Sequence, residues 1–259
     1  MKKPSEIDQL KKHKKGVGSE KPPLMYADEK GERLPTWNPH PGCGFDCYYC
    51  YGKQTYERSK CPLCRAFRPH FHPERMAQKF EKGKTYFVES LGDPAFIPPA
   101  IFQQILDHLA EFPGTTFMLQ SKNPKCFIEE AYKYPANVWL GTTIETNLEK
   151  LARCYSKAPG ILERFHWLCK VQEAHPELHY YVTFEPIMTC QILELLDIAL
   201  YLHADAVYVG RENHEHCLPE PAEYELVELV RQLKEKLGPE RVHTKTLGLA
   251  WWERESGAK

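Results

Sequence analysis

The chain has 259 residues, a mass of 30.1 kDa and a formal net charge of −1, with 42% hydrophobic and 27% charged residues. This composition is that of an ordinary globular protein, and the length suits a single α/β barrel domain. The balanced charge excludes a global attraction to nucleic acid or membranes, so polyanion binding would need a local patch. Without an apolar N-terminal leader or a membrane-length apolar run, we expect a cytoplasmic protein.

Residues 1–35 form a polar, lysine-rich segment that contains the run Lys11-Lys12-His13-Lys14-Lys15 and several glycine and proline residues. This composition predicts a flexible, solvated arm, and it also suits a basic arm that contacts nucleic-acid phosphates. We expect residues 36–259 to form the folded domain, which begins with a short strand near residues 34–38.

Three cysteines follow in one short run, Cys43-Gly-Phe-Asp-Cys47-Tyr-Tyr-Cys50. In a cytosolic chain, thiols stay reduced, so these residues indicate metal ligands rather than disulfides. Three thiolates on one loop can bind three irons of a [4Fe–4S] cluster and leave the fourth iron without a protein ligand. Tyr49 can shield such a cluster from water. This matters because the redox potential of an iron–sulfur cluster depends on its exposure to solvent.

A second pair, Cys61-Pro-Leu-Cys64, leaves other metal sites open. Cys47 and Cys50 followed by this pair give C-x2-C-x10-C-x2-C, the pattern of a four-thiolate zinc site. In a further alternative, Cys61 and Cys64 hold a separate zinc ion or an auxiliary cluster together with His70 and His72. The pair can also be two ordinary thiols in a loop.

From residue 85 onward, short β-rich runs alternate with helical stretches. The predicted strands are residues 85–90, 115–121, 138–145, 179–185, 206–212 and 241–246, which are rich in β-branched and aromatic residues. Residues 101–112 and 226–237 show the apolar periodicity of amphipathic helices. Residues 192–202 are apolar nearly all round, which predicts a well-buried helix.

Strands that alternate with helices predict parallel βαβ units. The expected fold class is α/β, a partial (βα)6 TIM-like barrel with mostly parallel strands, and a doubly wound sheet is the alternative. The cysteine loop precedes the first clear strand in the sequence and follows the short strand near residues 34–38. We therefore expect it near the N-terminal end of the barrel, beside the first strand. In such barrels the chemistry takes place at the C-terminal ends of the strands, so we expect the polar residues at these ends, including Glu89 and Gln120, to converge on one cavity.

An ordered series of segments carries a resemblance to a known family. The segments are residues 67–75 (FRPHFHPER), 86–93 (YFVESLGD), 117–124 (FMLQSKNP), 137–145 (NVWLGTTIE), 183–186 (TFEP) and 209–212 (VGRE). The cysteine run resembles the signature of radical S-adenosylmethionine (SAM) proteins, and the whole series is similar to the phage Gp37/Gp68 (DUF5131) family. The Cys61/Cys64 pair and Arg211, which replaces a glycine, depart from the family pattern.

The resemblance implies a radical SAM enzyme with a [4Fe–4S] cluster on a partial barrel. In such an enzyme an electron donor reduces the cluster, and SAM is cleaved to a 5′-deoxyadenosyl radical that abstracts hydrogen from a substrate. The residues expected to contact SAM are Tyr49, Ser90, Asp93, Lys122, Thr143 and Glu145. The residues expected to contact substrate are Glu185, Arg211, Glu212 and Lys245.

The first hypothesis is therefore a radical SAM enzyme with an unidentified substrate. Nucleic acid is the preferred substrate class because of the lysine-rich arm and the cations Lys122, Arg211 and Lys245. The alternative is a zinc-stapled α/β module that binds nucleic acid or a protein partner without catalysis. His214, His216 and Cys217 resemble a metal-binding group, but their polar surroundings favour a surface loop over a metal site.

Overall fold

The computed structural model of the chain describes residues 33–212, 214, 216–245 and 247–256. Most of the predicted arm, residues 1–32, lies outside the described residues. Seven strands form one sheet in the order β1 to β7, and every neighbouring pair is parallel. The strands are β1 Thr36–Trp37, β2 Thr85–Val88, β3 Thr116–Gln120, β4 Val138–Thr143, β5 His179–Phe184, β6 Ala206–Gly210 and β7 Val242–Lys245.

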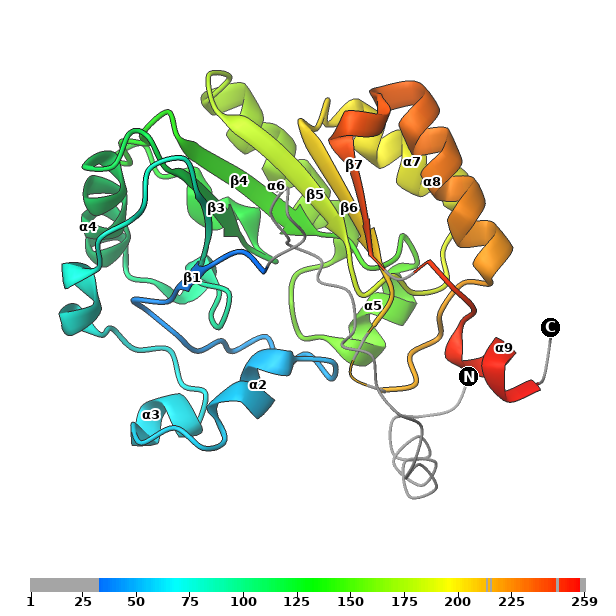
Figure 1. The fold of residues 1–259 in the computed structure, drawn as a ribbon, viewed down its shortest axis with the longest axis horizontal. Helices are drawn as coiled ribbons and strands as arrows, with labels where there is room; N and C mark the ends of the chain where they lie inside the picture. Colours follow the sequence, from blue (N-terminus) through cyan, green and yellow to red (C-terminus); the bar gives the residue numbers. More distant parts are fainter. Residues whose placement is uncertain (1–32, 213, 215, 246, 257–259) are drawn as a thin grey trace.

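The sheet curls into an open half-barrel, with β1 and β7 at its two edges (Figure 1). This arrangement confirms the α/β class and the partial barrel. A doubly wound sheet is excluded, because its strand order reverses at a switch point, whereas here the strands follow one another in chain order. Each predicted strand exists, and the later six end one or two residues before the predicted boundary.

The longer helices lie on the outer face of the sheet (Figure 1). They are α4 Pro99–Ala110, α6 Ile161–Ala174, α7 Ile192–Tyr201 and α8 Glu223–Leu237. The shorter helices are α2 Tyr51–Tyr56, α3 Pro62–Arg65, α5 Glu149–Tyr155 and α9 Trp251–Ser256, and the 3-10 turns are η2 Pro73–Ala77, η3 Pro94–Phe96, η4 Pro124–Phe127 and η5 Pro239–Arg241. Within the described ranges, no helix has the length and apolar character needed to cross a membrane.

Alternation along the strands divides the apolar side chains between two cores. On β3, Phe117 and Leu119 belong to the main core with the outer helices, whereas Met118 belongs to a smaller cluster. The same division separates Val182 from Tyr181 on β5. The outer face therefore anchors the helices, and the inner face is partly filled by large side chains.

Helix α7 differs from its prediction as a helix that is buried on all sides. Leu195 and Ala199 are fully buried, but Leu193 is 64% and Tyr201 is 67% exposed. The helix covers the sheet from outside, so only one of its faces meets the core. The amphipathic predictions for α4 and α8 are confirmed, with Ile105 and Leu233 fully buried.

A three-cysteine cavity at the C-terminal strand ends

A cavity of about 490 Å³ opens at the C-terminal ends of the strands. Its lining includes one polar side chain at or just after the end of each strand from β2 to β7. These side chains are Glu89, Gln120, Thr143, Glu185, Glu212 and Lys245. The barrel thus brings residues that are distant in sequence to the same cavity, as expected at the C-terminal face of such folds.

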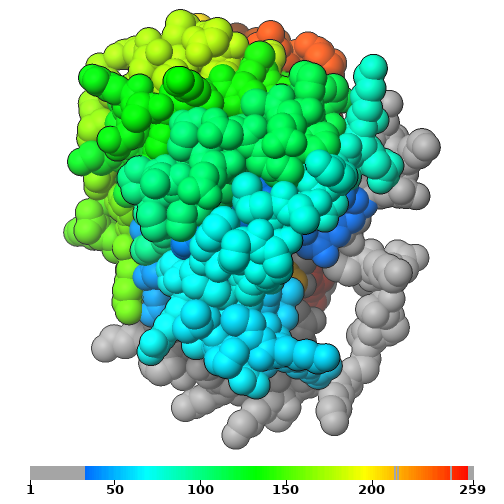
Figure 2. All heavy atoms as spheres, turned by 90° about the vertical axis from the view of Figure 1, so that its left-hand side faces the viewer, coloured from blue at the N-terminus to red at the C-terminus, as the bar shows by residue number. Residues whose placement is uncertain are grey.

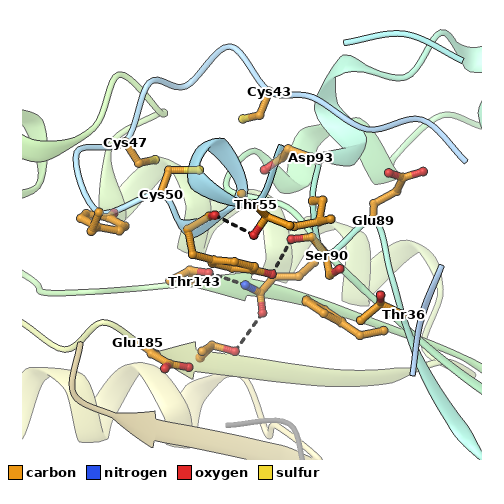
Figure 3. A pocket seen from close by; sticks show the side chains of 18 of the residues that line it. Thr36, Cys43, Cys47, Cys50, Thr55, Glu89, Ser90, Asp93, Thr143 and Glu185 are labelled. Carbon is orange, nitrogen blue, oxygen red and sulfur yellow. Dashed lines mark hydrogen bonds between the residues drawn. The ribbon is translucent and has the colours of Figure 1, made fainter. Parts of the chain in front are cut away.

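Cys43, Cys47 and Cys50 all line this cavity. Figure 3 shows the three side chains along one side of the cavity with their sulfur atoms directed toward a common space, and Glu185 on the opposite side. Burial raises the pKa of the Cys43 thiol, and the neighbouring charges of Cys47 and Cys50 raise it further. Thiolates that share one cavity repel one another unless a cation neutralises them, which is the electrostatic setting of a metal-binding site.

The loop that carries the three cysteines packs closely on the rest of the protein. Phe45 contacts Phe96 edge to face, with ring centroids 4.7 Å apart. Phe45, Cys47 and Tyr49 belong to an apolar cluster that includes Tyr155 of α5. The Cys47 sulfur also lies 3.1 Å from the Ser156 hydroxyl. These contacts hold the loop against the rest of the protein.

Glu145 forms the centre of a buried charge network behind the cavity. Its carboxylate accepts hydrogen bonds from the Tyr49 hydroxyl and the Lys122 ammonium, and its Oε2 accepts one from Arg164 at 2.7 Å. Lys122 also lies 5.2 Å from the centre of the Tyr49 ring. Glu145 is 1% exposed and is not among the lining residues, whereas Tyr49 and Lys122 are. Glu145 therefore positions two cavity residues, and its own carboxylate does not face the cavity.

Asp93 and Ser90 line the cavity as expected, but their polar atoms are engaged locally. Asp93 accepts hydrogen bonds from the Ser121 hydroxyl at 2.6 Å and from the Lys122 backbone amide at 2.9 Å. It also caps η3 through the Ala95 amide. The Ser90 hydroxyl donates to Asn38 at 3.2 Å. Asp93 therefore ties the ends of β2 and β3 together beside the cysteines.

The residues expected to contact substrate fall into two groups. Glu185 and Lys245 line the cavity and form an ion pair with each other. Glu212 also lines it and accepts a hydrogen bond from His216 at 2.8 Å. Arg211 is instead buried away from the lining.

Arg211 donates to the Gly248 carbonyl at 2.7 Å and to the Pro221 carbonyl at 2.8 Å. Its guanidinium holds the C-terminal segment, so the structure does not place it among the substrate contacts. His216 is 4% exposed, so the prediction of a surface position for it is wrong.

Gln120 and Glu89 line the cavity, as their strand-end positions predicted, whereas the sequence analysis missed Arg164. Gln120 donates to Thr143 at 2.6 Å and accepts from Thr183 at 2.9 Å, which links β3, β4 and β5 across the cavity. Glu89 follows β2, and Arg164 comes from α6 to pair with Glu145. No local signal marks Arg164, because its partner lies on another element.

Cys61 and Cys64 lie outside the cavity lining. Their sulfur atoms meet the ring nitrogens of His70 and His72, and all four ligand atoms lie within 4.8 Å of one another. Within the described residues they do not join Cys47 and Cys50, so the four-thiolate zinc pattern is not formed. The structure instead brings together the two cysteines and two histidines of the alternative prediction.

The fold and the cavity define an α/β half-barrel protein with a three-cysteine loop at the C-terminal strand ends. Residues 29–167, more than half of the chain, match the family described as "Protein of unknown function (DUF5131)". The chain belongs to this family. Among curated proteins, no match was found.

Solved structures with a similar fold share little sequence with this chain. A spore photoproduct lyase variant with bound AdoMet and dinucleoside spore photoproduct has a TM-score of 0.52 at 10% identity, covering 78% of this chain and 60% of the lyase. Another spore photoproduct lyase variant has a TM-score of 0.56 at 9% identity, covering 79% and 74%. Streptococcus suis SuiB bound to S-adenosylmethionine has a TM-score of 0.52 at 11% identity, covering 82% and 50%. The chain thus spans between half and three quarters of these proteins, and the likeness concerns the fold.

Proposed function

We propose that the protein is a radical SAM enzyme in which Cys43, Cys47 and Cys50 bind a [4Fe–4S] cluster. The observation that carries this proposal is the convergence of these three thiols in one cavity at the C-terminal strand ends. A zinc-stapled binding module has no need of three cysteines in a cavity that is also lined by charged side chains at the strand ends. The likeness in fold to proteins with bound AdoMet supports the same proposal.

The residues present fit the proposed cofactors. Three thiolates are the ligand set that leaves one iron of a [4Fe–4S] cluster open. A volume of about 490 Å³ lies within the range of roughly 300–1,000 Å³ that is typical of small-molecule sites. When bound, the cluster would supply the electron for reductive cleavage of SAM, and an external one-electron donor would replenish it.

The side chains of the chain itself would bind and shield the reactants. Tyr49 is 8% exposed and lines the cavity together with Cys50, where its ring would limit the access of water. Thr143 and Gln120 offer hydroxyl and amide groups within a fixed hydrogen-bonded chain. Lys122 and Arg164 both pair with Glu145, so this group of two cations and one carboxylate carries a net positive charge. Lys122 lines the cavity, where this charge can attract the carboxylate of SAM.

The preference for a nucleic-acid substrate stays a prediction. Lys122 and Lys245 are each paired with a carboxylate, and Arg211 lies outside the cavity lining. The lysine-rich run at residues 11–15 lies outside the described residues. We therefore propose SAM as one substrate and name no second substrate. The link to the phage Gp37/Gp68 name also stays a prediction.

The test is anaerobic reconstitution of the full chain with iron and sulfide, followed by reduction in the presence of SAM. We expect a brown protein that contains about four irons per chain and releases 5′-deoxyadenosine. Cys43→Ala, Cys47→Ala and Cys50→Ala should each abolish this release, because each removes one of three cluster ligands. Cys154→Ala is the matched control, because Cys154 is exposed on α5.

The proposal would be contradicted if reconstituted protein took up no iron, or if it formed a cluster that left SAM intact under reduction. Retention of full activity in a Cys47→Ala variant would also contradict it, since the remaining two thiols cannot hold the proposed site.

A further inference from the structure

The cysteine–histidine group formed by Cys61, Cys64, His70 and His72 has the geometry of a closed tetrahedral metal site. The Cys61 sulfur lies 3.4 Å from His70 Nε2, and the Cys64 sulfur lies 3.5 Å from the same nitrogen and 3.2 Å from His72 Nε2. Bond lengths of about 2.3 Å to sulfur and 2.1 Å to nitrogen in a tetrahedral zinc site place these ligand atoms roughly 3.5 Å apart. The four ligand atoms are therefore already spaced as zinc requires.

The contacts of Nδ1 on each histidine ring show that the lone pair of Nε2 is available to bind a metal ion. His70 Nδ1 lies 2.7 Å from the Arg68 carbonyl oxygen, and His72 Nδ1 lies 2.6 Å from Glu74 Oε1. Both partners only accept hydrogen bonds, so Nδ1 carries the proton on each ring. Each Nε2 thus directs a lone pair at the sulfurs, and this orientation by an oxygen acceptor is typical of zinc-bound histidines.

Hydrogen bonds between the thiols and the rings do not account for the group. Two thiols offer two protons, but three sulfur–nitrogen contacts lie within 3.5 Å, so at least one contact lacks a proton. The S–H group is also a weak donor. A shared cation satisfies all four ligand atoms at once.

The ligand set favours zinc over a second iron–sulfur cluster. All four ligand atoms lie within 4.8 Å of one another, around a space for one ion. Ligands of a cluster bind different irons and stand farther apart. Two thiolates and two imidazoles with no open position form a structural zinc site.

The segment that carries these ligands has little apolar core of its own. Across residues 53–79, all of them described, only Cys64 and Phe67 are buried. The segment lies at the surface, where residues in blue to cyan form the lower part of the side seen in Figure 2. Such a segment needs a cross-link to hold a single structure. A zinc ion provides one, because the free energy of zinc binding stabilises the folded state.

The same segment lies directly against the loop that leads into Cys43. The backbone amide of His70 donates to the Pro41 carbonyl at 3.2 Å, and that of His72 donates to the Pro39 carbonyl at 2.8 Å. The Cys43 amide donates in turn to the Phe67 carbonyl at 3.3 Å. A metal ion held by His70 and His72 would therefore fix the path of the cysteine loop from outside the cavity.

We propose that Cys61, Cys64, His70 and His72 bind a structural zinc ion that braces the Cys43 loop. This site is separate from the catalytic cavity and does not require the SAM chemistry. Zinc binding replaces the two thiol protons, which are released to solvent. Zinc retention should not depend on the cluster, whereas the order of residues 53–79 should depend on zinc.

The experiment uses the full chain with Cys43, Cys47 and Cys50 all changed to alanine, so that no cluster forms. We expect this variant to retain equimolar zinc after extensive dialysis, as measured by elemental analysis. After the zinc is stripped and Co²⁺ is added, we expect the visible absorption of tetrahedral Co²⁺ and a thiolate-to-cobalt charge-transfer band. Cys64→Ser in the same background should lower zinc retention by more than about tenfold, and Cys154→Ser should leave it unchanged.

Absence of both zinc and the tetrahedral Co²⁺ spectrum in the cluster-free variant would overturn the proposal. Because this variant keeps all four ligands, the result does not depend on whether Cys64→Ser folds. Stripping zinc should also speed tryptic cleavage within residues 53–79 by about tenfold or more, and unchanged cleavage would overturn the bracing role. All these readouts are independent of SAM cleavage, so they fail or succeed separately from the proposed enzymatic function.

Discussion

Glu89 combines several features that are unusual for a glutamate. It is 2% exposed, and its backbone φ of 59° lies in the left-handed region that residues with a side chain rarely adopt. Its Oε1 accepts the His40 amide at 2.6 Å, while Oε2 has no hydrogen-bond partner among the described residues. Burial raises the pKa of this carboxyl to about 8. Strained, buried acids cluster at functional sites, and this one lines the cavity.

This raised pKa predicts a specific pH dependence of stability. The unfolded chain loses the Glu89 proton near pH 4.5, whereas the folded chain retains it up to about pH 8. Between these values the unfolded state binds fewer protons, so the free energy of unfolding should fall as pH rises. The slope contributed by Glu89 is at most about 1.4 kcal/mol per pH unit, and it should vanish above pH 8.

Glu89→Gln removes this titration and keeps the shape of the side chain. The melting temperature of the variant relative to the wild type should therefore rise from pH 5 to pH 8 in a calorimetric series at constant ionic strength. Glu130→Gln, at an exposed position, serves as the control. A constant difference between Glu89→Gln and wild type across this range would show that Glu89 is ionised in the folded protein.

At the scale of elements, the inner face of the sheet depends on one contact between β4 and β5. Gly141 is the direct neighbour of Tyr181 across these strands. A Cβ atom at position 141 would lie 2.5–2.6 Å from three atoms of the Tyr181 ring. The absence of a side chain at Gly141 therefore allows the fully buried Tyr181 ring to fill the inner face beneath the cavity.

Gly141→Ala should consequently destabilise the protein by about 1–3 kcal/mol through overpacking. The measurement is equilibrium unfolding in urea, with the change read from the midpoint at constant slope. Gly248→Ala is the matched control, because a Cβ there meets nothing within 4 Å, and it should change stability by less than about 0.5 kcal/mol. Equal stability of the two variants would contradict the close packing of β4 on β5.

At the scale of the whole molecule, the curl of the sheet brings distant strand ends into contact. Glu185 follows β5 and Lys245 ends β7, and their ion pair spans the intervening strand β6. Lys245 is 7% and Glu185 is 18% exposed at the side chain, so water only partly screens the pair. The ion pair therefore links the edge strand β7 to β5, which lies two strands further into the sheet.

Lys245→Met should destabilise the protein by about 1–3 kcal/mol, because it leaves the Glu185 carboxylate without its cation in a largely buried place. Adding Glu185→Gln to this variant should restore part of the loss, since no unpaired charge then remains. A double-mutant cycle followed by thermal unfolding measures the coupling. Strictly additive effects of the two substitutions would show that the ion pair does not hold the sheet edge.

Local patterns were sufficient for much of the architecture. The β-rich runs and apolar periodicities predicted the strands and the helices α4 and α8, because alternation and helical spacing report directly on one buried face. The cysteine run indicated a metal-binding loop, because its ligands are close in sequence. Strand-end positions likewise indicated Glu185, Glu212 and Lys245 as cavity residues.

The partners of these residues could not be predicted, because they are separated by long stretches of chain. Arg164 meets Glu145 only when α6 packs on the sheet, and Arg211 turns toward Gly248 rather than the cavity. The exposure of Leu193 follows from α7 having one free face.

The sequence alone determined the succession of strands and helices along the chain, the three-cysteine loop and the candidate ligands for a second metal. Only the tertiary structure decided that Cys61 and Cys64 join His70 and His72, and that Lys122 pairs with Glu145. The physical reason is that metal ligation and buried charge pairing depend on distances of a few ångströms, which the packing of distant segments sets.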